Sequence, residues 1–126
     1  MLANRPMHTT LPTTDLERAK RFYAEKLGLT PESESPGGGL FYRCGENTRF
    51  LLFPSQGAAS GTHTQAGWIV DDIEAEVAEL KARGLAFEEY ETPDFKMVKS
   101  VATIGPAKVA WFKDSEGNLL GLVQLL

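Results

Sequence analysis

The sequence predicts an α+β fold made of two similar modules, each containing a strand, a helix and a following hairpin. A stretch running from His8 to Leu29 recurs in similar form from Gln65 to Leu85. Each copy is followed by two apolar segments that are joined by turn-forming residues. The length of 126 residues is that of one domain. We therefore expect a single domain over 1–126, with module 1 at about 5–55 and module 2 at about 63–126.

The repeated stretch reads HTTLPTTDLERAKRFYAEKLGL in the first copy and QAGWIVDDIEAEVAELKARGL in the second. Asp15 in the first copy corresponds to Asp72 in the second, at an offset of 57 residues. Each copy ends in a glycine close to the same place, Gly28 and Gly84. Two copies of this length indicate one supersecondary unit that is used twice.

The first copy predicts a short strand over Met7–Leu11, closed by Pro12, and then an amphipathic helix. Thr14 and Glu17 have capping-box spacing, and Gly28 is suited to a left-handed helix end. Apolar residues recur at helical spacing between these signals. The stripe consists of Leu16, Ala19, Phe22, Tyr23 and Leu27. A helix is therefore expected from about Leu16 to Leu27.

A glycine-rich loop over 30–39 separates this helix from a hairpin, whose strands we expect at 40–44 and 49–53. A connector of small residues over 54–62 then marks the boundary between the two modules.

The second copy predicts the same order of elements with one insertion. We expect a strand over 64–70, and then a helix that begins at a capping box formed by Asp71 and Glu74 and ends at Gly84. A further strand is expected over 86–90. The last hairpin pairs 108–113 with 119–125, and Gly117 is placed to adopt positive φ in its turn.

The segment 91–106 has no short counterpart in module 1. It contains Phe95 and Met97, and is interpreted either as a flap over a binding site or as a surface strand and loop.

A sheet covered by helices on one face leaves its other face open. Two such halves sharing a sheet would enclose a concave, half-barrel groove, which is a favourable place for a ligand. Period-2 alternation divides the strand residues between the two faces. Those expected to face the groove are His8, Thr10, Leu51, Phe53, Gln65, Gly67, Ile69, Leu119 and Gly121, with Trp111 beside them. Those expected under the helices are Leu11, Phe50, Trp68, Leu120 and Leu122.

The composition argues against several classes of partner. A net charge of −4, without a run of lysine or arginine, is unfavourable for binding nucleic acid or a membrane surface. No stretch reaches transmembrane length, and the N-terminus lacks an apolar signal core. The single cysteine, Cys44, permits no internal disulfide and suits a reducing compartment. We expect a cytoplasmic protein.

Two motifs carry a resemblance to a known family. The first module contains D-L-x-x-A-x-x-F-Y-x-x-x-L-G-L, and the last hairpin contains D-x-x-G-N. Together, in this order and in a chain of two modules, they resemble the vicinal oxygen chelate superfamily of glyoxalases, bleomycin-resistance proteins and extradiol dioxygenases. The resemblance covers essentially the whole chain. It implies paired βαβββ modules, a homodimer, and a ligand cavity inside each cupped sheet.

The resemblance also implies where a divalent metal would be held in metal-using members of the family. The four ligand positions fall on His8, Gln65, Leu51 (or Leu52 if the register slips by one) and Gly121. Leucine and glycine side chains offer no donor atom, whereas an open site for such an ion needs three or four donors. The prediction is therefore no metal cofactor. The alternative keeps a metal at His8 and Gln65, with His63 as a third donor.

The listed groove residues are mostly apolar and aromatic, which suits a planar or greasy small molecule. The main hypothesis is a metal-free protein of the bleomycin-resistance kind that sequesters such a ligand in a homodimer. The alternative is a metal-dependent lyase, isomerase or dioxygenase of the glyoxalase type that uses His8 and Gln65. An enzyme without a metal, or an accessory subunit, is a third possibility. The candidate ligand-binding residues are His8, Thr10, Gln65, Leu51, Phe53, Trp111, Gly121 and Phe95.

Overall fold

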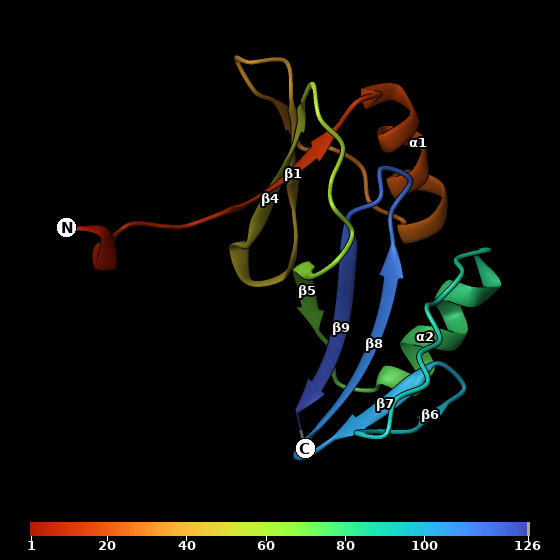
Figure 1. The fold of residues 1–126 in the computed structure, drawn as a ribbon. Coiled ribbons are helices and arrows are strands. Elements are labelled where there is room, and N and C mark those ends of the chain that lie inside the picture. Colours follow the sequence, from red (N-terminus) through yellow and green to blue (C-terminus); the bar gives the residue numbers. More distant parts are fainter. Residues whose placement is uncertain (126) are drawn as a thin grey trace.

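The computed structural model describes residues 1–125 and contains two mixed sheets of four and five strands (Figure 1). Module 1 consists of β1 (Thr9–Thr13), α1 (Leu16–Leu27), β2 (Ser33–Glu34), β3 (Leu40–Arg43) and β4 (Arg49–Pro54). Module 2 consists of β5 (Thr64–Ile69), α2 (Ile73–Ala82), β6 (Met97–Val98), β7 (Val101–Ile104), β8 (Ala107–Lys113) and β9 (Leu119–Leu125). Two short 3₁₀ turns, η1 (Leu2–Asn4) and η2 (Gly45–Asn47), complete the elements.

The two modules share one topology, except that module 2 has an additional edge strand, β6. The strand order is β1-β4-β3-β2 in the first sheet and β5-β9-β8-β7-β6 in the second. In each sheet the first strand runs parallel to the last, and the other pairs are antiparallel. The predicted fold class of two β-α-β-β-β modules is therefore confirmed. The expected shared sheet is instead two separate sheets, so the cup is unclosed.

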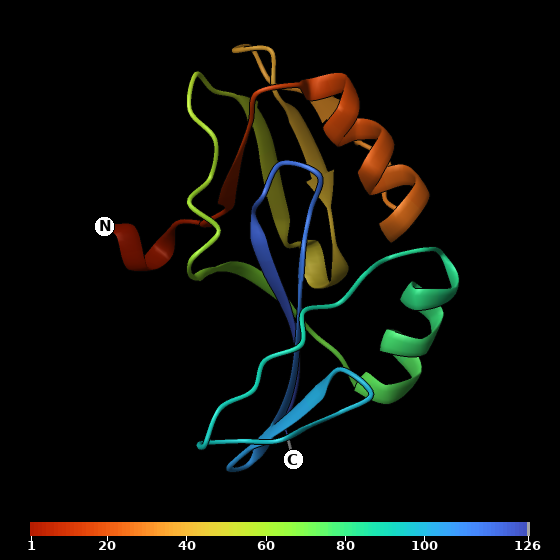
Figure 2. The ribbon, with the colours of Figure 1, turned by 45° about the vertical axis from the view of Figure 1, so that its right-hand side comes forward.

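Both helices lie on the same side of the two sheets, and the opposite side is open (Figure 1). The last hairpin, drawn in blue in Figure 2, extends from the sheet of module 2 to the start of α1. Among the described residues 1–125, no helix is both long enough and apolar enough to span a membrane.

The predicted bounds of α1, Leu16 to Leu27, are confirmed, but the capping residue of each helix lies one position later than predicted. Asp15, not Thr14, caps α1 by accepting a hydrogen bond from the Arg18 backbone N–H at 3.1 Å. Asp72, not Asp71, does the same for α2, accepting from the backbone N–H of Ala75 at 3.2 Å. In module 1 the Thr13 hydroxyl accepts from the Asp15 N–H at 2.9 Å. This bond turns the chain before Asp15, so Thr14 lies outside the helix.

Two predicted strand limits are also wrong. Pro12 lies inside β1 and does not close it. β1 is the edge strand of its sheet, where the missing N–H of a proline leaves no ladder bond broken. The expected strand over 86–90 is reduced to one bridge between Phe87 and Phe112 and a bond from the Glu88 N–H to the Trp111 carbonyl. β7 already occupies the rest of that side of β8, so the segment has no further partner.

One apolar core lies between the helices and both sheets. The residues predicted for this face are buried, except for Trp68, which is half-buried. The Trp68 ring lies 6.3 Å from Phe50 of module 1 and 6.2 Å from Phe112 of module 2. Phe50 in turn stacks on Tyr42 at 4.8 Å. These aromatic contacts make the core continuous across the two modules.

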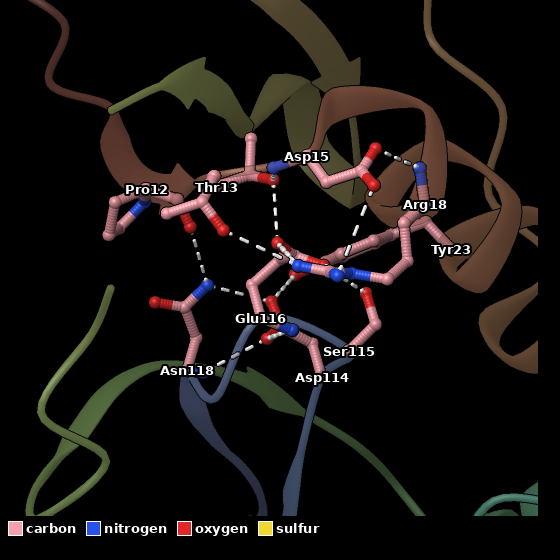
Figure 3. A network of polar contacts seen from close by, with 10 residues as sticks. Pro12, Thr13, Asp15, Arg18, Tyr23, Asp114, Ser115, Glu116 and Asn118 are labelled. Atoms are coloured by element: carbon pink, nitrogen blue, oxygen red, sulfur yellow. Dashed lines mark hydrogen bonds and ion pairs between the residues drawn. The ribbon is translucent and has the colours of Figure 1, made fainter. Parts of the chain in front are cut away.

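The turn of the D-x-x-G-N motif, Asp114–Asn118, connects module 2 to module 1 (Figure 3). The Tyr23 hydroxyl donates to Asp114 Oδ2 at 2.7 Å, and Asn118 Nδ2 donates to the Pro12 carbonyl at 3.1 Å. Gly117 has φ of 84°, as predicted for this turn. The motif that resembled a known family therefore joins the modules.

Glu116 provides the ionic part of this connection. Arg18 Nε and Nη2 each donate to one of its carboxylate oxygens at 2.8 Å, and the Thr13 hydroxyl donates at 2.8 Å. Hydrogen bonds from Arg18, and then from Ser115 and Thr13, lower the pKa of the Glu116 carboxyl to about 2, although its burial opposes this shift. Glu116 is thus held ionised within the contact between modules.

Candidate functional site

The open face of the first sheet contains a pocket with a volume of about 380 Å³. Thr10, Leu51 and Phe53 line it, as strand alternation predicts for side chains opposite the core. Thr10 and Leu51 are register partners in β1 and β4. The remaining wall comes from the loop before β3 and from the end of β4, and comprises Ser35, Gly37, Gly39 and Pro54. This pocket is mostly apolar, with hydroxyl groups at Thr10 and Ser35.

A cationic and aromatic group lies beside this pocket on the same sheet face. Phe41 is the register partner of Leu51, across β3 and β4. The Arg49 guanidinium carbon lies 4.6 Å from the Phe41 ring centroid, within the range of a cation–π contact. The His8 ring meets the same phenyl ring edge-on, at 5.7 Å and 75°. Phe41 and Arg49 were missed by the sequence reasoning, although pairing with Leu51 across the predicted hairpin could have identified Phe41.

The open face of the second sheet contains a flat area next to an indole ring. Gly67, Gly121 and Trp111 are neighbours across β5, β9 and β8. Gly121 is buried, and a Cβ atom there would lie 3.6 Å from both the Trp111 ring and the Thr64 methyl group. Gly67 is exposed, and its bare backbone forms a shelf next to this position. Trp111 also contacts Phe95 at 5.8 Å and Tyr90 at 5.4 Å. Tyr90 was not among the predicted site residues.

The inserted segment supplies the ring that covers Trp111. It forms the β6–β7 hairpin at the edge of the second sheet, and Phe95 precedes β6. The segment therefore contains the surface strand that one interpretation expected, and its role as a flap over a binding site stays a prediction.

The shelf continues into a large exposed apolar surface. The next row across the sheet joins Ile69, Val123 and Val109. Ile69 is 77% exposed, and Leu125 at the end of β9 is 67% exposed. Such a contiguous apolar face usually marks a ligand-binding or association surface.

Gln65 lies at an irregularity of β5. Thr64 pairs with Leu119 and Ala66 with Leu120, which leaves Gln65 as an extra residue in the strand. Its Oε1 is buried and has no hydrogen-bond partner among residues 1–125. Gly67, rather than Gln65, is the residue that lies beside Gly121.

The candidate residues therefore form two groups, one on each sheet. Thr10, Leu51 and Phe53 line the pocket of the first sheet, with His8 next to it. Trp111, Gly121 and Phe95 lie together on the second sheet. The pocket of module 1 includes no residue of module 2.

The donor set at the family's metal positions does not fit a divalent ion. His8 is exposed and packs on Phe41, and Gln65 has an amide as its only donor group. Leu51 and Gly121 have no donor atom in their side chains. His63, considered as a third donor, is exposed. Within residues 1–125, no three His, Cys, Asp or Glu side chains are grouped closely enough to hold a metal.

Comparison with known proteins gives one family. The family model described as Glyoxalase/Bleomycin resistance protein/Dioxygenase superfamily matches residues 5–122. No functionally curated protein matches the chain.

Solved structures share the fold over almost the whole chain. TnmS3, an antibiotic binding protein from Streptomyces sp. CB03234, is 26% identical, with a TM-score of 0.67 and 98% of each chain covered. Lactoylglutathione lyase from Agrobacterium tumefaciens is 25% identical, with a TM-score of 0.63 and coverage of 96% of this chain and 93% of that one. UcmS2 has a TM-score of 0.73 at 20% identity, covering 94% and 96% of the two chains. At that identity the likeness to UcmS2 concerns the fold alone.

Proposed function

Because the chain belongs to the Glyoxalase/Bleomycin resistance protein/Dioxygenase superfamily, we propose that it binds an apolar, aromatic small molecule without a catalytic metal. The proposal depends on one observation. The open sheet faces present aromatic and apolar side chains at the place where a metal-using site would need donor atoms. Binding would be non-covalent and would sequester the ligand.

The second sheet supplies the surface for a planar ligand. Gly67 leaves an exposed stretch of backbone without a side chain, next to the buried Gly121 and the Trp111 indole. Phe95 and Tyr90 also contact the indole, at centroid distances of 5.8 and 5.4 Å. A planar ring could lie on the shelf and stack on Trp111, a contact that buries a large area at little cost in side-chain entropy. The likeness to TnmS3, an antibiotic binding protein, supports the binding of a small molecule.

We also propose a homodimer in which the two groups of site residues are brought together between copies. β1 and β5 are edge strands, and their outer backbone groups have no strand partner among residues 1–125. The exposed Ile69 and Leu125 are apolar side chains that a second copy would cover.

We also propose that the protein is cytoplasmic, since its single cysteine suits a reducing compartment.

A metal-dependent lyase of the glyoxalase type is the second candidate function. The buried, unpartnered Oε1 of Gln65 favours it, because an orphaned polar atom can indicate a missing ligand. The likeness to lactoylglutathione lyase also favours it. Against it stands the absence of side-chain donors at Leu51 and Gly121.

The test is a calorimetric and thermal-shift screen of planar aromatic compounds on protein treated with a chelator. A ligand at 100 times its dissociation constant should stabilise the protein by about 2.7 kcal/mol. Trp111→Ala should weaken binding, whereas Leu16→Ala, on the far side of the sheet, should not. If the treated protein binds no aromatic compound, and stoichiometric metal restores binding and is itself lost in His8→Ala, the lyase becomes the better proposal.

The dimer has a separate measurement. Light scattering after gel filtration should give twice the 13.8 kDa mass of the chain. Ile69→Asp should shift the protein toward the monomer, because it places a charge on the apolar surface that association would bury. A monomeric wild-type protein at micromolar concentration would contradict this part of the proposal.

A further inference from the structure

We propose that Arg49 binds a carboxylate of the ligand, so that the open face of module 1 selects aromatic acids over neutral aromatic compounds. This inference rests on the proposed function, in which a dimer brings the pocket of module 1 together with the shelf of module 2, and it adds the charge of the ligand. It starts from an arginine that contacts an aromatic ring and makes no ion pair with any of residues 1–125.

The Phe41 contact orients the Arg49 guanidinium. The guanidinium carbon lies over the phenyl ring, 4.6 Å from its centroid, and this cation–π contact restrains the side chain. Its N–H groups lie in the guanidinium plane, and this fork matches the two oxygens of a carboxylate. The contact therefore reduces the loss of side-chain freedom when an anion binds, because part of that freedom is already lost.

The neighbouring arginine shows what is missing at Arg49. Arg43 is the register partner of Arg49 and lies on the same sheet face. Its guanidinium donates to both carboxylate oxygens of Glu32 and to Asn47 Oδ1. Arg49 makes no ion pair with any of residues 1–125. The Arg43 guanidinium therefore already donates to partners within the protein, whereas the Arg49 guanidinium is available to bind an external anion.

Arg49 is also close enough to the pocket for one ligand to reach both. It lies two residues from Leu51 on β4, and alternate residues point to the same face, about 7 Å apart along a strand. Phe41 lies between Arg49 and the pocket, because it contacts the Arg49 guanidinium and is the register partner of Leu51. An aromatic body in the pocket of about 380 Å³ would therefore place a carboxylate on its ring near the guanidinium.

The local charges favour an anion in spite of the net charge of −4. Glu32 is the acidic group next to this cluster, and both of its oxygens are engaged by Arg43. Hydrogen bonds from Arg43, with the charges of Arg43 and Arg49, lower the pKa of the Glu32 carboxyl, so its negative charge is already compensated. The His8 ring, edge-on to Phe41, supplies a further N–H donor. Exposed carboxylates farther away are screened over about 8 Å at physiological salt.

The experiment compares three ligands of one shape by titration calorimetry on chelator-treated protein. The ligands are 2-naphthoate, 2-naphthamide and 2-naphthylmethylammonium. The carboxylate should bind about tenfold more tightly than the amide, and the ammonium more weakly than either. Arg49→Gln should reduce the affinity for the carboxylate to that for the amide, and leave the amide unchanged. Arg49→Lys should restore part of the preference.

Arg21→Gln is the matched control, since it removes the same charge from the exposed surface of α1, on the covered side of the sheet. It should leave all three affinities unchanged. Equal binding of carboxylate and amide, or equal losses in the Arg49 and Arg21 variants, would overturn the inference and leave the proposed function intact. Failure of all three ligands to bind the wild-type protein would overturn both.

Discussion

The junction between the modules and the open sheet face use polar and aromatic residues in opposite ways. In the junction, formed by Thr13, Arg18, Tyr23, Asp114, Glu116 and Asn118, almost every polar group has a partner within the chain. On the open face, aromatic rings are half-exposed and Arg49 makes no ion pair within residues 1–125. Groups satisfied internally stabilise a fold, whereas groups left incomplete are available for a ligand.

This difference explains what the two family motifs convey. In the helix motif, Asp15 caps α1, Ala19 is fully buried, and Tyr23 donates to Asp114. In the hairpin motif, Asp114 and Asn118 are buried and bonded to each other. The motifs therefore define the joining of the modules. They identify the family and carry no information about the ligand.

The largest effect on stability should come from Asp114→Ala. Asp114 accepts from the backbone N–H groups of Glu116 and Asn118, and from the side chains of Tyr23 and Asn118. Its removal leaves four buried donors without their acceptor, so we expect a loss of about 3–5 kcal/mol in the free energy of unfolding. Urea denaturation monitored by circular dichroism measures this loss.

Tyr23→Phe is the companion variant, because it removes one of these donors and keeps the ring in the core. It should cost about 1–2 kcal/mol. If Asp114→Ala costs no more than Tyr23→Phe, the turn does not hold the modules together as described.

A smaller effect should appear when the free energy of unfolding is measured as the pH is lowered. The pKa of Glu116 falls from 4.5 to about 2 on folding, mainly because of the hydrogen bonds from Arg18. A carboxyl with a lowered folded pKa contributes stability above its unfolded pKa, and that contribution disappears as the pH falls to the folded pKa. We expect a loss on the order of 2 kcal/mol between pH 4.5 and pH 2, since Arg18 is half-exposed and partly screened.

Glu116→Gln provides the comparison for this pH dependence. It should be less stable than the wild type at pH 7, and the difference should shrink between pH 4.5 and pH 2. Parallel profiles for the two proteins over that interval would mean that another carboxyl is responsible.

The fold could be predicted from the sequence because the repeated unit has a strong local pattern. The apolar stripe of α1 and the positive φ at Gly28 and Gly117 are properties of a few neighbouring residues. The errors arose where a distant partner decides the outcome. Pro12 is tolerated because β1 is a sheet edge, and the segment 86–90 fails to pair because β7 occupies most of that side of β8.

The sequence indicated which residues face the open side of the sheets, but it did not indicate how those residues are arranged relative to one another. Alternation correctly placed Thr10, Leu51 and Phe53 on the open face, where they line one pocket. The irregularity at Gln65 depends on the pairing of β5 with β9, which no local pattern reveals. Arg49 is one of 13 basic residues, and its missing partner becomes evident only when every neighbour is placed.

Two neighbouring glycines of the open face should differ in what an added methyl group costs, and the Gly121 variant should show the smallest effect on stability. A Cβ at Gly67 would lie 2.8 Å from the Gly121 carbonyl oxygen, so Gly67→Ala forces backbone atoms apart and should cost about 1–3 kcal/mol. A Cβ at Gly121 would meet Thr64, Ala110 and Trp111 at 3.6 Å, which is ordinary contact. Gly121→Ala should therefore change stability by less than about 0.5 kcal/mol. Its methyl group would fill the space between Thr64 and the Trp111 indole, so affinity for a planar ligand at the indole should fall while the melting temperature stays constant. Unchanged affinity in stable Gly121→Ala protein would remove the shelf from the binding site and leave the pocket of module 1 as the place where the ligand binds.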